Sequence, residues 1–115
     1  MRRLRIILLV VATVALAPVA GSAVPIAYES LTVGATAVGL AFSTLNHDGR
    51  QIRRCAGRLE TAQVRYRFDG TNPTATEGIV VEIGDWLEID RHEVATAARF
   101  IRTGATSGVF RVHCW

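Results

Sequence analysis

Short segments in which apolar and polar residues alternate follow one another along most of this chain. The clearest is Val64–Phe68, in which apolar residues alternate with two arginines. A period of two places the apolar side chains on one face of a β-strand and the arginines on the other. Asp69 and Gly70 then supply turn residues, and Pro73 cannot donate to a sheet ladder. This segment therefore predicts a strand that runs into a tight turn.

Similar patterns, separated by turn residues, recur at short intervals. They predict strands at 26–33, 51–60 and 63–69, a hairpin within 79–90, and a final hairpin with arms at 99–103 and 109–114. The other segments are predicted as a weak strand or short turn of helix at 34–42, a loop at 46–49, and a helical turn or crossing loop at 91–98. Short strands without a long helix predict an all-β fold, a single Ig-like β-sandwich of about seven strands.

The hairpin within 79–90 has two alternative registers. A loop of three residues, from Gly84 to Trp86, pairs Val81 with Ile89 and collects the apolar side chains of both arms on one face. A loop of two residues would put the apolar side chains of the two arms on opposite faces. The three-residue loop is therefore the prediction, with Trp86 in the loop.

The final hairpin shows alternation in its second arm only. Phe110, Val112 and Cys114 are predicted to point inward, while in the first arm either Phe100 or Ile101 is buried. Within the earlier strand 51–60, a central glycine is interpreted as a β-bulge.

The first residues have the layout of a secretory leader. A start with three arginines is followed by an apolar stretch at 6–17, by Pro18, and by small residues at 21–23. This pattern predicts a signal peptide at 1–23, with the folded domain at 24–115. The apolar stretch before Pro18 is shorter than the ~20 residues that cross a bilayer, so a cleaved leader is preferred. The alternatives are an uncleaved membrane anchor that extends to Ile26 and a start codon placed ahead of a cytoplasmic protein.

The charge balance excludes one class of partner. The chain has thirteen arginines, no lysine and ten acidic residues, and three of the arginines lie in the leader. The remaining ten arginines therefore face ten acidic residues, and the net charge of the domain is close to zero. A domain without net positive charge has no overall electrostatic attraction to nucleic acid.

Cys55 and Cys114 are the only cysteines. In an oxidising compartment they could form a disulfide, and closing a loop of this size stabilises a fold by on the order of 4 kcal/mol. The alternative is a pair of buried free thiols that act as small apolar residues. No spacing of cysteine or histidine residues typical of a metal site is present, and no cofactor is predicted.

Two small groups of polar residues are candidates for a metal-binding or catalytic site. Glu88, Asp90 and His92 share one face of a strand and could hold a divalent metal or act as an acid–base pair. The preferred interpretation is a solvated edge strand whose charges discourage aggregation. His47 and Asp48 lie in a turn, and no nucleophile elbow accompanies them. No catalytic residue is predicted.

Two sets of residues are candidates for binding. Arginines on strands that could be neighbours would form an interaction face for an acidic partner, unless they pair with acidic residues across strands: Arg65, Arg67, Arg99, Arg102 and Arg111. Aromatic residues would form a stacking platform for sugars if they are exposed together: Tyr28, Tyr66, Trp86 and Trp115. Nothing else in the sequence supports a carbohydrate ligand.

Nearly the whole chain after the leader resembles a family of small phage virion structural proteins. The resemblance lies in residues 60–78, with RYRFDGTNPT, in the Gly-Asp turn within 81–87, in IRTGATSG of 100–108, and in the final strand. It implies a compact β-sandwich without enzymatic activity that is used in particle assembly or surface decoration. A weaker similarity, at Asp69-Gly70 and Pro73-Thr74, is to Ig-like repeats beside chitobiase and other glycosidases. It implies an accessory or adhesion module.

The predicted function is therefore that of a non-enzymatic structural or interaction protein, a phage-like virion or decoration subunit. The alternative is an exported binding or adhesion module of Ig-like type. The expected partners are other protein subunits, including copies of the same chain, and not nucleic acid. Contact with a membrane is expected only through an uncleaved leader. The leader predicts a periplasmic or secreted protein, whereas a virion subunit would assemble in the cytoplasm.

Overall fold

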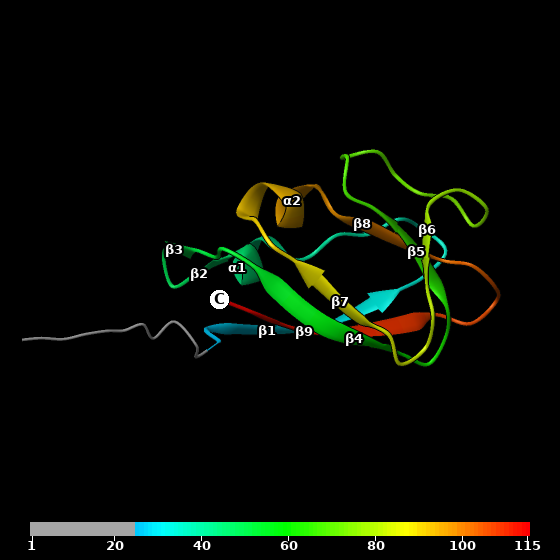
Figure 1. Ribbon diagram of the computed structural model, residues 1–115, viewed down its shortest axis with the longest axis horizontal. Helices are drawn as coiled ribbons and strands as arrows, with labels where there is room; N and C mark the ends of the chain where they lie inside the picture. Colours follow the sequence, from blue (N-terminus) through cyan, green and yellow to red (C-terminus); the bar gives the residue numbers. More distant parts are fainter. Residues whose placement is uncertain (1–24) are drawn as a thin grey trace, which may run out of the picture.

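A computed structural model describes residues 25–115 of the chain, so the leader predicted at 1–23 lies outside the described residues. Two antiparallel sheets lie one over the other in this part of the chain (Figure 1). The four-stranded sheet has the order β1 (Ala27–Val33), β9 (Gly108–Cys114), β4 (Cys55–Glu60) and β7 (Trp86–Ile89). The three-stranded sheet has the order β6 (Ile79–Val81), β5 (Val64–Arg67) and β8 (Arg99–Arg102). These seven strands in two sheets confirm the all-β sandwich.

Short elements close one end of the sandwich. They are the helices α1 (Phe42–Leu45) and α2 (His92–Ala97) and the ribbon of β2 (Asn46–His47) with β3 (Arg50–Gln51). The turn of this ribbon consists of Asp48 and Gly49, both with positive φ, so the loop predicted at 46–49 is confirmed at 48–49 only, because Asn46 and His47 form β2. The predicted helical turn at 91–98 is confirmed as α2. Among residues 25–115 there is no helix with the length and apolar character needed to cross a membrane.

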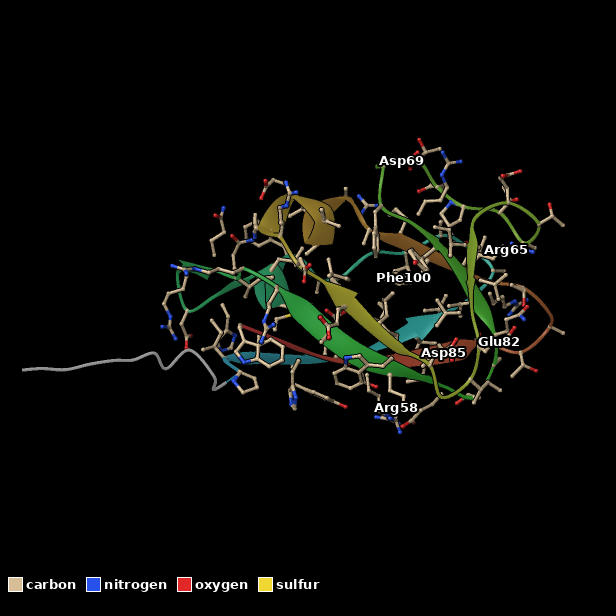
Figure 2. The ribbon with its side chains drawn as sticks, viewed as in Figure 1. Arg58, Arg65, Asp69, Glu82, Asp85 and Phe100 are labelled. Atoms are coloured by element: carbon tan, nitrogen blue, oxygen red, sulfur yellow. A yellow bond between two sulfur atoms is a disulfide. The ribbon has the colours of Figure 1, made fainter. Side chains whose placement is uncertain are left out.

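The core lies between the sheets and takes one face from each. Phe100 of β8 is 1% exposed and Phe110 of β9 is 2% exposed, and their ring centroids are 5.3 Å apart. Figure 2 shows Phe100 in the space between the two sheets. Phe100, and not Ile101, is therefore the buried residue of its strand. The predicted inward positions Val112 and Cys114 are confirmed as well.

The disulfide between Cys55 and Cys114 is present. The two residues are directly opposite each other in the β4–β9 ladder, with 4.1 Å between their Cα atoms. Both are at most 1% exposed. In antibody domains the conserved disulfide joins the two sheets, whereas here it joins two neighbouring strands of one sheet. The bridge therefore fastens the C-terminal strand within its own sheet.

The predicted hairpin within 79–90 is wrong. β6 pairs with β5 in the three-stranded sheet, and β7 pairs with β4 in the four-stranded sheet. Val81 and Ile89 are both buried, as expected, but they lie in different sheets, on opposite sides of the core. The alternation of apolar and polar residues identifies the buried face of a strand but not the strand beside it. The same alternation is therefore compatible with a hairpin and with a connection that crosses from one sheet to the other. Trp86 consequently lies in β7 and not in a loop.

The predicted final hairpin is wrong for the same reason. β8 pairs with β5, while β9 lies between β1 and β4, so residues 103–107 cross from one sheet to the other. The bulge proposed within 51–60 is also absent, because the β4 register is continuous on both sides of Gly57. A Cβ atom at Gly57 would lie 2.1 Å from the carbonyl oxygen of Arg111. The glycine therefore allows a close approach of two strands.

Candidate binding face

The outer face of the four-stranded sheet gathers aromatic and arginine side chains. In one row across the sheet, Arg111 of β9 pairs with Arg58 of β4, and Arg58 pairs with Trp86 of β7. In the next row, Tyr28 of β1 pairs with His113 of β9. Alternation places all five side chains on the side away from the core. We call this set, Tyr28, Arg58, Trp86, Arg111 and His113, the aromatic–arginine face.

Two large rings at the edges of this face are open to solvent. Tyr28 is 54% exposed and Trp86 is 57% exposed. Tyr28 lies on β1 and Trp86 on β7, which are the two edge strands of the sheet. The Tyr28 ring makes an edge-on contact with the His113 ring, with 5.2 Å between their centroids. An exposed indole and an exposed phenol thus lie on either side of the arginines.

Arg111 is held in place by its neighbours. Its Nε donates to a carboxylate oxygen of Glu60 at 2.7 Å. One of its terminal nitrogens donates to the Ser30 hydroxyl at 3.2 Å and to the Tyr28 hydroxyl at 3.4 Å. The hydrogen bond with Glu60, and then that with Tyr28, raises the pKa of Arg111 above its ordinary value. Arg111 is therefore an oriented cation that also positions the Tyr28 ring.

Arg58 differs from Arg111 in having no partner. Its guanidinium forms no hydrogen bond or ion pair with any other residue of 25–115. The side chain is exposed and points away from the core below β4 (Figure 2). An exposed arginine with five free N–H groups, directly beside the exposed Trp86, is available to a ligand.

A pair formed by Arg54 and Trp115 extends the face toward the C-terminus. The guanidinium carbon of Arg54 lies 4.5 Å from the centroid of the Trp115 ring. Between this pair and Arg58, strand β4 carries Ala56, which lies in a row with His113 and Glu88. The methyl group of Ala56 is shorter than all of its neighbours. Ala56 is 7% exposed, so the longer side chains around it cover most of its methyl group.

The structure divides the five arginines predicted as an interaction face. Arg65, Arg67, Arg99 and Arg102 lie on β5 and β8 of the three-stranded sheet, whereas Arg111 lies on the other sheet. Arg65 donates to two backbone carbonyls of the β5–β6 loop. Arg99 donates to two backbone carbonyls at the end of α2. The guanidinium groups of Arg65 and Arg99 are thus used in hydrogen bonds to the backbone. The three-stranded sheet therefore has fewer arginines available to a partner than the sequence predicts.

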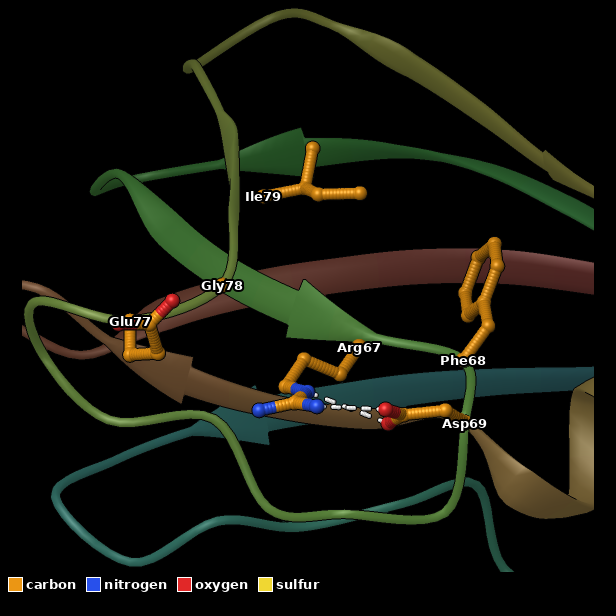
Figure 3. Close-up of a pocket in the computed structure, with 6 residues that line it drawn as sticks. All are labelled: Arg67, Phe68, Asp69, Glu77, Gly78 and Ile79. Atoms are coloured by element: carbon orange, nitrogen blue, oxygen red, sulfur yellow. Dashed lines mark hydrogen bonds and ion pairs between the residues drawn. The ribbon is translucent and has the colours of Figure 1, made fainter.

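A hollow beside the β5–β6 loop is the other candidate (Figure 3). It has a volume of about 600 Å³ and is lined by Arg67, Phe68, Asp69, Glu77, Gly78 and Ile79. Arg67 donates twice to the Asp69 carboxylate, at 3.1 and 2.5 Å.

These hydrogen bonds, together with one from the backbone N–H of Thr71, lower the pKa of Asp69 below its ordinary value. The hydrogen bond with Asp69 raises the pKa of Arg67. Arg67 and Asp69 are paired with each other, so neither charge is left free to bind a ligand in the hollow.

The polar groups weighed as catalytic sites are not assembled. Glu88 is exposed on edge strand β7. His92 begins α2, and its Nδ1 lies 2.9 Å from the carbonyl oxygen of Ile52. At the tip of the β2–β3 ribbon, Nε2 of His47 lies 3.4 Å from Oδ2 of Asp48. Within 25–115, no group of three or more His, Cys, Asp or Glu side chains is placed to hold a metal ion.

The aromatic residues predicted as a platform are largely brought together. Tyr28, Trp86 and Trp115 belong to the four-stranded sheet or directly follow it, and Tyr28 and Trp86 are exposed on its outer face. Tyr66 instead packs against Phe68, with 4.6 Å between the ring centroids. Arg58 was missed, although it alternates with the buried positions of β4 and the same pattern places it on the outer face.

Comparisons of the chain with family models, with curated proteins and with solved structures found no match. The resemblance to phage virion proteins therefore stays a prediction from the sequence. The fold and the binding face rest on the structure alone. The buried disulfide is typical of proteins that mature in an oxidising compartment.

Proposed function

We propose that this protein is a non-catalytic binding domain that recognises its partner through the aromatic–arginine face. The observation that carries the proposal is the row in which unpartnered Arg58 lies between exposed Trp86 and oriented Arg111. Trp, Tyr and Arg are the residue types that contribute most to binding free energy in protein interfaces. Two rings that are more than half exposed remain in contact with water until a partner covers them.

The sheet supports binding because it holds these side chains in fixed relative positions. Strand β9 is paired on both sides, and so is β4. The disulfide joins these two central strands at one end. A rigid platform loses little conformational entropy on binding, which favours affinity.

The proposed place of action is outside the cytoplasm, in the periplasm or the medium. Two features support it: the leader predicted at 1–23, and the disulfide, which persists in oxidising compartments. A binding domain in such a place needs no catalytic group, in line with the alternative prediction of an exported binding or adhesion module.

The proposal has a direct test. The purified, labelled protein is incubated with cells and extracellular material of the organism that produces it, and the retained fraction is measured. The double variant Tyr28→Ala/Trp86→Ala should lose at least tenfold in retention. Phe42→Ala is the matched control, because Phe42 is 80% exposed but lies on α1, away from the face. Equal retention of the double variant and the wild type would refute the proposal.

The virion or decoration subunit remains a second proposal. Its support is the motif resemblance, which falls on β5 with the loop after it and on β8 with the loop before β9. Size-exclusion chromatography with light scattering separates the two proposals. A ring-sized or trimeric species would support assembly, and a monomer at micromolar concentration would count against it.

A further inference from the structure

The two exposed rings are spaced so that one extended ligand can contact both of them. Trp86 and Tyr28 are on strands separated by three strand spacings and in neighbouring rows of the sheet. With ~4.8 Å between strands and ~3.4 Å per residue, the backbone positions of Trp86 and Tyr28 are about 16 Å apart. The negative face of an aromatic ring attracts the C–H groups of a sugar ring. A chain of several pyranose rings would therefore stack at both ends of the face.

Between the two rings, the cation that is left without a partner is Arg58. Glu60 neutralises Arg111, whereas Arg58 has no acidic partner. A guanidinium binds a carboxylate through two parallel hydrogen bonds. Glu88 lies in the neighbouring row, where its carboxylate can accept hydrogen bonds from hydroxyl groups. The face thus offers donors for a carboxylate in its middle and an acceptor for hydroxyls beside them.

An acidic peptide is a poorer occupant. The central strands β9 and β4 are paired on both sides, so their backbone N–H and C=O groups are already used. A peptide laid across this face would lose hydration of its own backbone without backbone partners in return. Sugar hydroxyls need only side chains and bridging water.

The footprint of the face suits a narrow, extended ligand. Measured flat, the sheet is four strands wide and about 20 Å long, on the order of 400 Å². A chain of pyranose rings that runs across the strands lies within this footprint and reaches both exposed rings.

We infer that the aromatic–arginine face binds an acidic polysaccharide, a chain of pyranose rings that carry carboxylates. Trp86 and Tyr28 stack on sugar rings, and Arg58 pairs with a uronate carboxylate between them. This inference rests on the proposed function, because it names the ligand of the same face.

The test uses the purified, disulfide-bonded protein and matched probes. Polygalacturonate, alginate and hyaluronate supply sugar rings with carboxylates. Methyl-esterified polygalacturonate supplies the same rings without charge, and polyglutamate supplies charge without rings. Binding is measured by isothermal titration calorimetry at fixed salt. We expect at least one polyuronate to bind at least tenfold more tightly than the methyl ester or polyglutamate.

Variants assign the binding to the face. Arg58→Gln and Trp86→Ala should each weaken polyuronate binding at least tenfold. Arg102→Gln removes the same charge from the other sheet, and Phe42→Ala removes an exposed ring elsewhere, so both should bind like the wild type. Urea denaturation of each variant establishes that it is folded before binding is compared.

The remaining outcomes overturn the inference. They are binding to none of the three acidic polysaccharides, equal binding of polyglutamate or of the methyl ester, or an equal effect of Arg102→Gln and Arg58→Gln. The cell-retention experiment separates this failure from failure of the proposed function. If Tyr28→Ala/Trp86→Ala loses retention while polyuronates do not bind, the face binds something else. If retention is also unchanged, both proposals fail.

Discussion

Replacing Cys55 and Cys114 by alanine removes the only disulfide among residues 25–115. The bridge closes a loop between residues 59 positions apart in the sequence. Constraining a loop of that length lowers the entropy of the unfolded chain by an amount worth about 4 kcal/mol at 25 °C. The two sulfurs are also at most 1% exposed, so their loss removes contacts from the core. A domain of this size has a total stability of roughly 5–15 kcal/mol, so the change is large.

The double variant should nevertheless keep the fold. Cys55 and Cys114 are opposite each other in a ladder that continues for six residue pairs, so the register of β4 and β9 does not depend on the bridge. The far-ultraviolet circular dichroism spectrum of the variant should match that of the wild type. The free energy of unfolding, measured by urea denaturation and tryptophan fluorescence, should fall by about 4 kcal/mol. The m-value should rise, because the unfolded chain becomes less compact.

A loss below about 1 kcal/mol with an unchanged m-value would refute this account, since the bridge would then not constrain the unfolded state. The matched control is the double variant measured with and without reductant. Reductant should lower the stability of the wild type and leave the variant unchanged.

Three further predictions follow from single positions. Gly57→Ala should destabilise the fold by several kcal/mol in urea denaturation, because its Cβ would meet a backbone oxygen at 2.1 Å, whereas Gly104→Ala, with open space at its Cβ, should be nearly neutral. Phe100→Ala should cost about 3–5 kcal/mol in the same assay, and Phe42→Ala less than about 0.5 kcal/mol, because the first ring is 1% exposed and the second 80%. Asp69→Asn should flatten the loss of stability in acid. The folded pKa of Asp69 is lowered from 3.8, so its contribution is present above that pH and is lost as the pH falls through the folded pKa.

Contrary results are equally specific. Equal stabilities of Gly57→Ala and Gly104→Ala would show that β4 and β9 do not approach closely there. An identical pH dependence of Asp69→Asn and wild type below pH 3.8 would show that its carboxylate gains nothing from its hydrogen bonds.

Local patterns were enough to predict most strands and their buried faces. The alternation in 109–114 correctly placed Phe110, Val112 and Cys114 in the core. Asp48 and Gly49 correctly marked a turn, because their backbone adopts the positive φ that these residue types accept more readily than others. Each of these features depends on residues close together in the sequence, so the sequence alone carries the information.

The candidate binding face could be predicted only in part. The sequence predicts the aromatic residues as a possible platform, but it groups the arginines only if their strands are neighbours. Arg111 instead shares a sheet with Arg58 and not with Arg65, Arg67 or Arg99. An arginine's availability also depends on contacts with distant loops, and no local pattern reports those contacts.

By itself, the sequence determined the all-β character of residues 25–115, the inward or outward direction of most strand residues, and the only pair of cysteines available for a disulfide. Tertiary structure alone decided the sheet that each strand joins, and with it the meeting of Tyr28, Arg58, Trp86 and Arg111 on one surface. The physical reason is that an alternating strand gains its burial energy from any apolar face that covers it. The partner strand is selected by how all the strands pack together, which is a property of the whole chain.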